Sequence, residues 1–342
     1  MCQRIQHGKR DAPVFASTAE GAKLNLGAGR GQDRGKCGMR CAVIGLGSMG
    51  GGAAKAALTG GLDVTGVDPS EAARNAFGNR AVARGADLDA GQEAVLVLTV
   101  NATQAEQALF GDGGAAVRMA PGGVVICSAT MAPGDAKRLA AQGTARGLLY
   151  LDAPVSGGAV AAREGRMTVM ASGSEAAFAA AKPLLDAVAG TVWNLGTEPG
   201  QGAAMKVVHQ LLAGVHIAAA AEAMALALRA GLDPHTVYGV VNGAAGASWM
   251  FKNRMAHVLA GDDTPLSAGD IFVKDLGLVE AMARDVALPV PLAAQALQLF
   301  VAQRAIGQGG RDDAFVLRVW QAIAGFALPG EPGGAEARKH ED

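Results

Sequence analysis

The sequence predicts an α/β protein in which a doubly wound parallel sheet in the N-terminal part is followed by an all-α domain. Between residues 41 and 195, short apolar runs alternate with helix-like stretches, the order that places helices on both faces of a parallel sheet. After Gly202 the long segments are rich in alanine and leucine, and no convincing strand interrupts them. The length of 342 residues allows two domains.

The expected strands are short apolar runs, and Gly60-Gly61 is a plausible helix stop before the second of them. In order, the strands are expected at Cys41–Ile44, Leu62–Val67, Ala94–Thr99, Val124–Cys127, Leu148–Asp152, Arg166–Ala171 and Thr191–Leu195. The last two are expected to extend the same domain. The C-terminal helices are expected at Ala203–Ala230, Asp233–Asn242, Ser248–Ala260, Asp270–Asp285, Pro291–Ala305 and Ala314–Ala327.

Four segments are expected along the chain. Residues 1–38 are polar, glycine-rich and without a hydrophobic period. They are either a disordered extension or the result of a mis-assigned start, with Met39 as the natural one. The sheet domain is expected at 39–201 and the all-α domain at 202–328. Residues 329–342 should form a flexible tail.

The charge and cysteine content exclude some classes of protein. Lysine and arginine number 30 and aspartate and glutamate 31, a balance that argues against a nucleic-acid partner. The cysteines form no Cys-x-x-Cys pair and no Cys/His cluster with zinc-like spacing. We therefore expect no metal site, and free thiols in a reducing compartment. The cysteines are Cys2, Cys37, Cys41 and Cys127.

The longest apolar run, Leu211–Leu228, is expected to be a buried helix. It consists largely of alanine and is interrupted by His216 and Glu222, which makes it weakly hydrophobic for a membrane span. No apolar signal-peptide segment follows the N-terminal charges. A cytoplasmic protein without a membrane partner is expected.

A glycine loop follows the first expected strand, where a helix should begin. Its pattern is G-x-G-x-x-G, with glycines at 45, 47 and 50. In Rossmann-type folds the first glycine permits a tight turn, the second lets the backbone approach a pyrophosphate, and the third lets helix and strand pack closely. The helix N-terminus offers N–H groups to the phosphates. Cofactor contacts are expected from Gly45, Leu46, Gly47, Ser48, Met49 and Gly50.

Asp68 directly follows the second expected strand. An acid roughly twenty residues past the glycines accepts hydrogen bonds from a ribose hydroxyl, and its charge repels a 2′-phosphate. No arginine follows it directly, so NAD is the expected cofactor and NADP the disfavoured alternative. The other role open to Asp68 is that of a turn residue before Pro69.

Two further motifs carry chemistry. The turn Ser156-Gly157-Gly158 follows a strand and is either a concave anion-binding arrangement or an ordinary tight turn. The pattern Gly-x-Gly-x-x-x-Lys, which ends at Lys206, opens the first long helix. Because its neighbours are apolar, Lys206 is either snorkelling to solvent or buried for a purpose.

These motifs in this order, with Lys274-Asp275 near the C-terminus, resemble the 3-hydroxyisobutyrate dehydrogenase family over about Met39–Ala327. Four segments are most similar to the branch of that family that oxidises L-threonate to 2-dehydro-L-erythronate with NAD. They are Ile126–Pro133, His209–Leu226, Ser248–Met255 and Ile271–Leu276.

The resemblance implies a two-domain dehydrogenase whose small polyhydroxy-acid substrate binds in the cleft between an NAD-binding domain and the all-α domain. The latter would also serve in oligomerisation, and a homo-oligomer, either a dimer or a tetramer, is expected. Lys206 would be the catalytic base. Ser156, Gly157 and Gly158 would hold the substrate carboxylate. Asn101, Thr130 and Lys274 would lie near the nicotinamide, and Gln210 would lie at the substrate where the family often has Asn.

The chemistry agrees with these roles. A lysine must have its pKa lowered from about 10.4 to act as a base near neutrality. Burial between domains and a positive nicotinamide ring both lower it. The residues do not distinguish oxidation at C2 from attack at C3, so a 3-hydroxyisobutyrate or tartronate-semialdehyde type of enzyme is the alternative. A non-catalytic NAD-binding regulator is an alternative of another class, against which the presence of Lys206 counts.

Other candidates have weaker patterns. His209 and His216 lie seven residues apart on one helix, but no third ligand has suitable spacing, so core or interface positions are expected. Trp249, Met250 and Met255 would either line the pocket or pack between helices.

Overall fold

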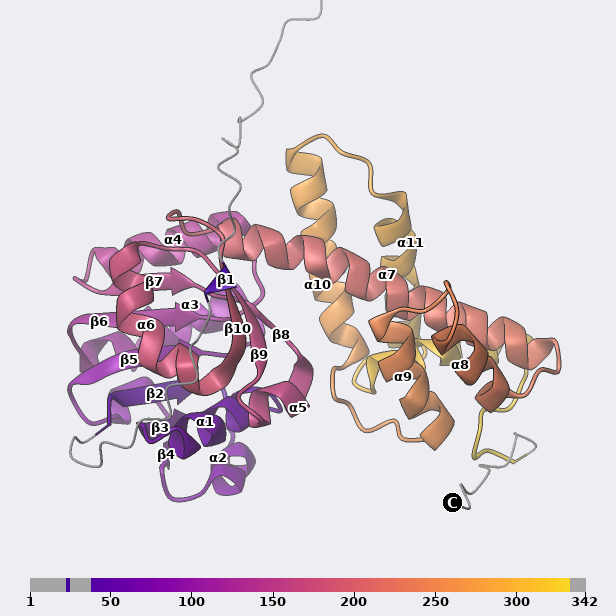
Figure 1. Ribbon diagram of the computed structural model, residues 1–342, viewed down its shortest axis with the longest axis horizontal. Helices are drawn as coiled ribbons and strands as arrows, with labels where there is room; N and C mark the ends of the chain where they lie inside the picture. The colour runs from indigo at the N-terminus through magenta and orange to yellow at the C-terminus, as the bar shows by residue number, and fades with distance from the viewer. Residues whose placement is uncertain (1–22, 25–37, 333–342) are drawn as a thin grey trace, which may run out of the picture.

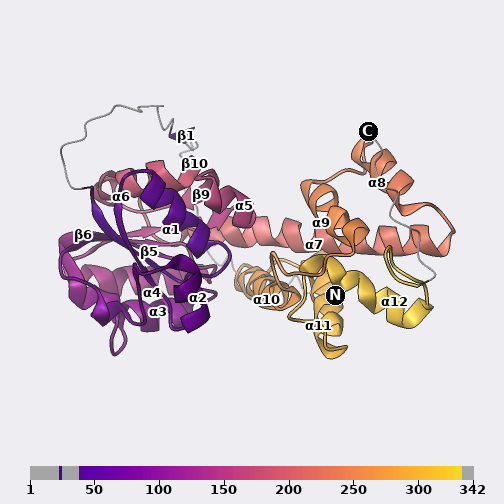
Figure 2. The ribbon, with the colours of Figure 1, turned by 90° about the horizontal axis from the view of Figure 1, so that it is seen from below.

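The computed structural model describes residues 23–24 and 38–332. The expectations for the rest of residues 1–38 and for 333–342 lie outside the described residues. The N-terminal half contains the sheets and the C-terminal half is helical (Figure 1). A single long helix, α7 (Gln201–Arg229), begins against the sheet half and runs through the helical half (Figure 2).

The main sheet is parallel and has the strand order β4-β3-β2-β5-β6-β7. This order is that of a Rossmann fold, and it confirms the predicted fold class. The strands are β2 (Arg40–Ile44), β3 (Asp63–Val67), β4 (Ala81–Val82), β5 (Gln92–Val97), β6 (Met119–Cys127) and β7 (Leu149–Asp152).

Both faces of this sheet are buried, which explains the near-continuous apolar runs. Along β2, Cys41 and Val43 join a core with α1 and α6, whereas Ala42 and Ile44 join a core with α3 and α4. The helices of this half are α1 (Gly50–Thr59), α2 (Glu71–Phe77), α3 (Ala102–Phe110), α4 (Pro133–Thr144), α5 (Gly158–Arg163) and α6 (Glu175–Val188). Two short 3-10 helices accompany them at Gly85–Asp87 and Ala115–Arg118.

The last two expected strands belong to the N-terminal half but form a separate small sheet with the order β1-β10-β9-β8. Its strands are β1 (Lys23–Leu24), β8 (Val155–Ser156), β9 (Met167–Ala171) and β10 (Ala189–Asn194). An isolated bridge between Asp152 and Ser172 joins it to the end of β7. Strands of two residues, such as β4 and β8, are too short to show a period in the sequence.

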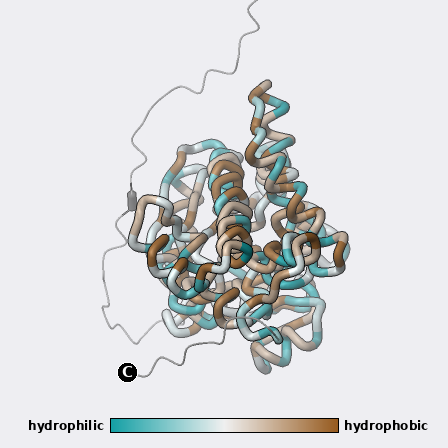
Figure 3. The backbone as a smooth tube through the Cα atoms, turned by 90° about the vertical axis from the view of Figure 1, so that its right-hand side faces the viewer, coloured by the Kyte–Doolittle hydropathy of each residue, from teal (hydrophilic) through white to brown (hydrophobic). Residues whose placement is uncertain are grey.

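The helical half packs around α7 and contains α8 (Pro234–Asn242), α9 (Trp249–Ala260), α10 (Gly269–Asp285), α11 (Pro291–Ala305), the 3-10 helix η3 (Asp313–Leu317) and α12 (Arg318–Ala324). Figure 3 views this half and shows hydrophobic and hydrophilic residues alternating along its helices. The prediction of one helix at Ala314–Ala327 was wrong. Five successive buried residues adopt the tighter η3, and α12 ends before Gly325, which is left-handed at φ 64°.

The hydropathy argument against a membrane span needs correction. In the described part of the chain, α7 is long and apolar enough to cross a membrane by length and composition alone. Its packing gives more information than its composition, because α7 contacts α9, α10 and η3 along its length. Residues such as Ile217, Ala221 and Met224 on α7 are buried in the core of the helical half.

Two of the four cysteines, Cys41 and Cys127, are described. Both are free thiols, as predicted, and both are buried. Cys2 and Cys37 lie outside the described residues.

Candidate active site

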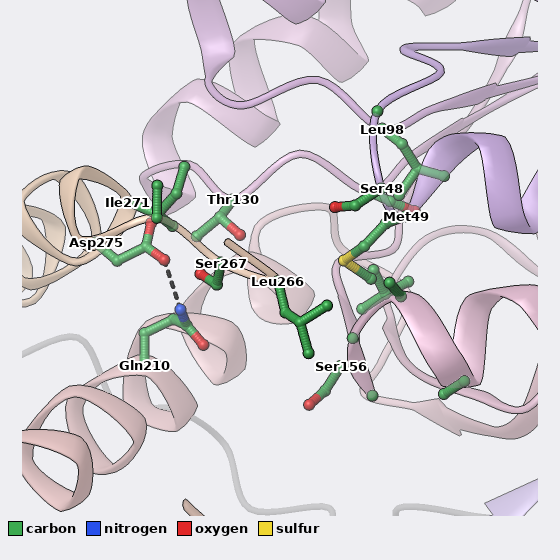
Figure 4. Close-up of a pocket in the computed structure, with 18 of the residues that line it drawn as sticks. Ser48, Met49, Leu98, Thr130, Ser156, Gln210, Leu266, Ser267, Ile271 and Asp275 are labelled. Carbon is green, nitrogen blue, oxygen red and sulfur yellow. Dashed lines mark hydrogen bonds between the residues drawn. The ribbon is translucent and has the colours of Figure 1, made fainter. Parts of the chain in front are cut away.

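A cavity of about 790 Å³ lies between the two halves, where loops at the carboxyl ends of the parallel strands meet α7, α9 and α10. Figure 4 shows Ser48, Met49 and Leu98 on one side, Gln210 and Asp275 on the other, and Ser156 below them. Such a crevice is where doubly wound folds bind their ligands. Of the predicted site residues, the cavity is lined by Gly47, Ser48, Met49, Gly50, Thr130, Ser156, Gly157, Gly158, Lys206, Gln210 and Lys274.

The glycine loop has the geometry that a dinucleotide needs. Gly45 has φ +87°, and a Cβ there would lie 2.7 Å from the carbonyl oxygen of Leu98. A Cβ on Gly50 would lie 1.6 Å from the carbonyl oxygen of Gly45, so the helix packs directly on the loop. A Cβ on Gly47 would meet nothing within 4 Å, and Gly47 therefore leaves an open approach from the cavity.

The same loop presents donors without acceptors. The backbone N–H groups of Gly47, Ser48 and Met49 have no hydrogen-bond partner among the described residues. Helix α1 starts directly after them and has no acidic residue in its first turn. These residues fit the pyrophosphate of a dinucleotide, which accepts hydrogen bonds and favours the positive end of the helix dipole.

Asp68 holds the glycine loop in place. Its carboxylate accepts hydrogen bonds from the N–H of Leu46 at 2.7 Å and of Ser70 at 2.8 Å. Neither Leu46 nor Asp68 is among the residues that line the cavity, and the hydrogen bond between them ties the loop to the end of β3. The guanidinium of Arg74 donates to the carbonyl oxygens of Asp68 and Pro69, both at 2.9 Å. The structure therefore gives Asp68 the turn role that the sequence left open, beside its predicted role toward a ribose.

Asn101 does not line the cavity either. It caps α3, and its side-chain oxygen accepts the N–H of Gln104 at 2.9 Å. Thr130 does line the cavity, and its carbonyl oxygen accepts a hydrogen bond from Lys274 Nζ at 3.1 Å. Lys274 Nζ also donates to the carbonyl oxygen of Val100 at 2.8 Å, so α10 is tied to both of these loops.

The start of α7 is fixed by Asp152, at the end of β7. One carboxylate oxygen, Oδ2, accepts the N–H groups of Gly200 at 2.8 Å and Ala203 at 2.9 Å, and the hydroxyl of Ser172 at 3.3 Å. Burial raises the pKa of Asp152 to about 6, although these donors lower it. The sequence placed Asp152 at the end of an expected strand and indicated no function for it.

Lys206 lies in the second turn of α7 and lines the cavity, with only 7% of its surface exposed. The sequence left open whether Lys206 snorkels to solvent or is buried, and the structure shows that it is buried. Its Nζ makes no hydrogen bond or ion pair within residues 38–332. Burial lowers the pKa of Lys206 to about 8; Asp275 raises it and Lys274 lowers it. A buried amine with this pKa can hold or release a proton near neutrality.

The 156–158 turn depends on its glycines. Gly157 has φ +123° and Gly158 φ +68°, both in the region that disfavours side chains. Ser156 Oγ lies 3.1 Å from His209 Nε2, and Gln210 Nε2 donates to Asp275 Oδ2 at 2.5 Å. His209, expected at a core or interface position, lies between the two halves and lines the cavity, a location that the sequence did not indicate.

Helix α9 supplies cavity residues that sequence reasoning did not assign. Arg254 is buried and pairs with Asp313 at 2.5 and 3.0 Å, and it also donates to the side-chain oxygen of Asn253 at 2.5 Å. No sequence pattern marked this pair. Trp249 and Met250 line the cavity, whereas Met255 is fully buried in the helical core. In the described part of the chain, no group of three or more His, Cys, Asp or Glu residues could hold a metal ion.

Two family descriptions match most of the chain. Residues 40–196 match the NAD binding domain of 6-phosphogluconate dehydrogenase, and residues 200–320 match the NAD-binding part of NADP-dependent 3-hydroxyisobutyrate dehydrogenase. Two curated relatives, each described as L-threonate dehydrogenase, are 50% identical. The one from Escherichia coli O6:H1 covers 84% of this chain and 96% of the relative, and the one from Haemophilus influenzae covers 83% and 95%.

A solved structure from Salmonella typhimurium, described as 3-hydroxyisobutyrate dehydrogenase, is 50% identical and superposes with a TM-score of 0.79, covering 82% of this chain and 99% of that one. Fold, cavity and relatives together define an NAD(P)-dependent hydroxyacid dehydrogenase, an oxidoreductase. Within that class, the chain belongs to the 3-hydroxyisobutyrate dehydrogenase family.

Proposed function

We propose that the protein oxidises L-threonate to 2-dehydro-L-erythronate with NAD, and that Lys206 is the general acid/base. The observation that carries this proposal is the buried Lys206 amine, which has a pKa of about 8 and lies in the cavity between the glycine loop and α10. The L-threonate dehydrogenases at 50% identity support the choice of substrate.

Different residues of this chain would transfer the proton, bind the substrate and position the loops beside the cofactor. A bound oxidised nicotinamide supplies the acceptor for the hydride that leaves the substrate carbon. Neutral Lys206 takes the hydroxyl proton as the carbonyl forms, and protonated Lys206 returns it in the reverse direction. The 156–158 turn would bind the substrate on the opposite side of the cavity from α10. Lys274 would fix the Val100 and Thr130 loops beside the cofactor.

NAD is proposed over NADP because of Asp68. Its carboxylate accepts the N–H of Leu46 in the glycine loop, and its negative charge would repel a 2′-phosphate. Arg74 is the nearby cation, but its guanidinium donates to the carbonyl oxygens of Asp68 and Pro69. We also propose a homo-oligomer, supported by the exposed apolar side chains of Met205, Val208 and Leu212, which recur along α7.

The test of the proposed function is the rate of NADH formation with L-threonate, D-erythronate, 3-hydroxyisobutyrate, D-glycerate and L-serine, each with NAD and with NADP. L-Threonate with NAD should give the highest kcat/KM. The solved relative described as 3-hydroxyisobutyrate dehydrogenase favours the alternative substrate. A preference for 3-hydroxyisobutyrate or a three-carbon acid would leave the proposed role of the lysine in place and change the proposed substrate. If no acid of the panel gives NADH although NAD still binds, the result would favour a non-catalytic NAD-binding regulator.

The rate of oxidation should depend on the protonation of Lys206. Only the neutral amine accepts a proton, so kcat/KM for oxidation should rise with pH and level off above the free-enzyme pKa of about 8. The reverse reduction needs the protonated amine and should fall over the same interval. With NAD bound, the positive nicotinamide lowers the pKa further, so kcat/KM measured at saturating NAD should level off at a lower pH than this free-enzyme value. A flat profile across this interval would contradict the role of Lys206.

A further inference from the structure

Helix α9 and the segment before α10 form one wall of the cavity, which we call the α9 wall. Its members are Trp249, Met250, Asn253, Arg254 and residues 265–268. Figure 4 shows Leu266 and Ser267 of this segment among the side chains that line the cavity. The wall is separate from the glycine loop, the 156–158 turn and α7, so it can contact a part of the substrate that those elements do not hold.

A buried ion pair fixes the polar part of the α9 wall. Arg254 Nε donates to Asp313 Oδ1 at 2.5 Å, and Arg254 Nη2 donates to Asp313 Oδ2 at 3.0 Å. The backbone N–H of Asp313 donates to the carbonyl oxygen of Ser267 at 2.8 Å, so η3 supports both segments of the wall. Burial raises the pKa of Asp313 to about 6, although Arg254 lowers it, and the carboxylate is therefore ionised at pH 7.

The same pair determines which atom of the Asn253 amide remains available. Arg254 Nη1 lies 2.5 Å from Asn253 Oδ1. A guanidinium only donates hydrogen bonds, so the amide must turn its oxygen toward Arg254. Its Nδ2, which carries two N–H donors, makes no hydrogen bond within residues 38–332. Because Asn253 lines the cavity, the wall offers an uncharged donor to a ligand.

The cavity has little positive charge to spare in the described part of the chain. Apart from Lys206, each lysine or arginine that lines it is paired with a carboxylate. The pairs are Arg166–Glu164, Arg254–Asp313 and Lys274–Asp275. Lys206 itself must be neutral to accept a proton. A second carboxylate on the substrate would therefore lose its water there without gaining an unpaired cation, which is costly.

We propose that Asn253 and the neutralised Arg254 bind the terminal hydroxyl of the substrate, so that the α9 wall selects polyhydroxy monocarboxylic acids against dicarboxylic acids of the same length. The carboxylate of the substrate remains at the 156–158 turn. The Asn253 amide donates to the hydroxyl oxygen, and Asp313 cancels the charge that would otherwise attract a second carboxylate. The inference rests on the proposed function for the reaction. It makes Asn253 a specificity residue and Asp313 a positioning residue that acts through Arg254.

Binding to the NADH complex tests the charge selection without turnover. L-Tartrate has the length of L-threonate but carries a second carboxylate in place of the terminal CH₂OH. Calorimetric titration at about pH 9, where Lys206 is mostly neutral, should give L-tartrate a Kd at least roughly tenfold higher than that of L-threonate. In Asp313→Asn, which leaves the charge of Arg254 uncompensated, this ratio should fall by at least roughly tenfold. Equal affinities in the unaltered protein, or an unchanged ratio in a variant that Tm shows to be folded, would overturn the proposal.

Asn253→Ala leaves the ion pair in place and tests the hydroxyl contact even if Asp313→Asn does not fold. In the same titration it should raise the Kd of L-threonate by roughly tenfold, the value of one good hydrogen bond. The Kd of 4-deoxy-L-threonate, which lacks the terminal hydroxyl, should change little. Gln295→Ala is the control, because this amide is exposed on α11 and does not line the cavity. Equal losses of affinity for both acids in Asn253→Ala would contradict the role of Asn253.

The outcomes distinguish this inference from the proposed function. If the unaltered protein binds L-threonate more tightly than L-tartrate but forms no NADH from it, the proposed function is refuted and the selection by the α9 wall stands. If the protein oxidises L-threonate but binds both acids equally, the proposed function stands and the selection is refuted.

Discussion

Lys206→Met should lower kcat for L-threonate oxidation by at least about a hundredfold, the usual contribution of general acid–base catalysis. Methionine has a similar length but no titratable group. Because Lys206 is buried and its Nζ has no hydrogen-bond partner in the described structure, an apolar replacement should not lower the free energy of unfolding. The fold and NAD binding should therefore survive while the reaction loses its proton acceptor.

Three measurements check this: kcat and KM with L-threonate, Kd for NADH by fluorescence titration, and Tm. Lys182→Met is the matched control, because Lys182 is exposed and, in the described part of the chain, pairs only with Asp186 on the surface of α6. The control should keep its turnover within about twofold, since exposed pairs contribute little. Near-normal turnover of Lys206→Met, with both proteins folded, would remove Lys206 from the mechanism.

The helices and strands of this protein can be predicted well from the sequence where one or both faces of the element are buried. The strand at 41–44 is found because every residue in it contacts a core. The G-x-G-x-x-G motif indicates a dinucleotide loop because it follows that strand and because Asp68 follows the next one. The small sheet is harder to predict. Its strand β8 spans only Val155–Ser156 and is defined by pairing with β9, not by a pattern of its own.

The environment of the site residues depends on segments that are far apart in the sequence. Whether Lys206 is buried or snorkels depends on distant segments, among them α10, whose Lys274 and Asp275 lie close enough to shift its pKa. His209 becomes a cavity residue because the turn at Ser156, 53 residues earlier, reaches its ring. The position of His209 along α7 does not by itself distinguish it from the other residues of that helix. The combined motifs could therefore indicate the chemistry, but not the hydrogen bonds that link Ser156, His209, Gln210 and Asp275.

Asp152→Ala should destabilise the protein by about 3 kcal/mol or more and should also lower kcat. The substitution leaves the buried N–H groups of Gly200 and Ala203 without an acceptor, and each unsatisfied buried donor costs about 1–3 kcal/mol. It also removes a negative charge from the positive end of the α7 dipole. The start of α7 is also packed tightly against β7 and β9, since a Cβ at Gly202 would lie within 3 Å of the carbonyl oxygens of Asp152 and Met170.

The conservative variant separates stability from positioning. In Asp152→Asn the amide oxygen can occupy the place of Oδ2 and accept the same two N–H groups, so the loss in unfolding free energy should be nearer 1 kcal/mol. Urea denaturation measures this difference. Because α7 carries Lys206 shortly after the anchored turn, Asp152→Ala should lower kcat more than it raises KM even at a temperature where it is fully folded. Equal stability of the two variants would show that the start of α7 is held by its other contacts, and that Asp152 is dispensable as its anchor.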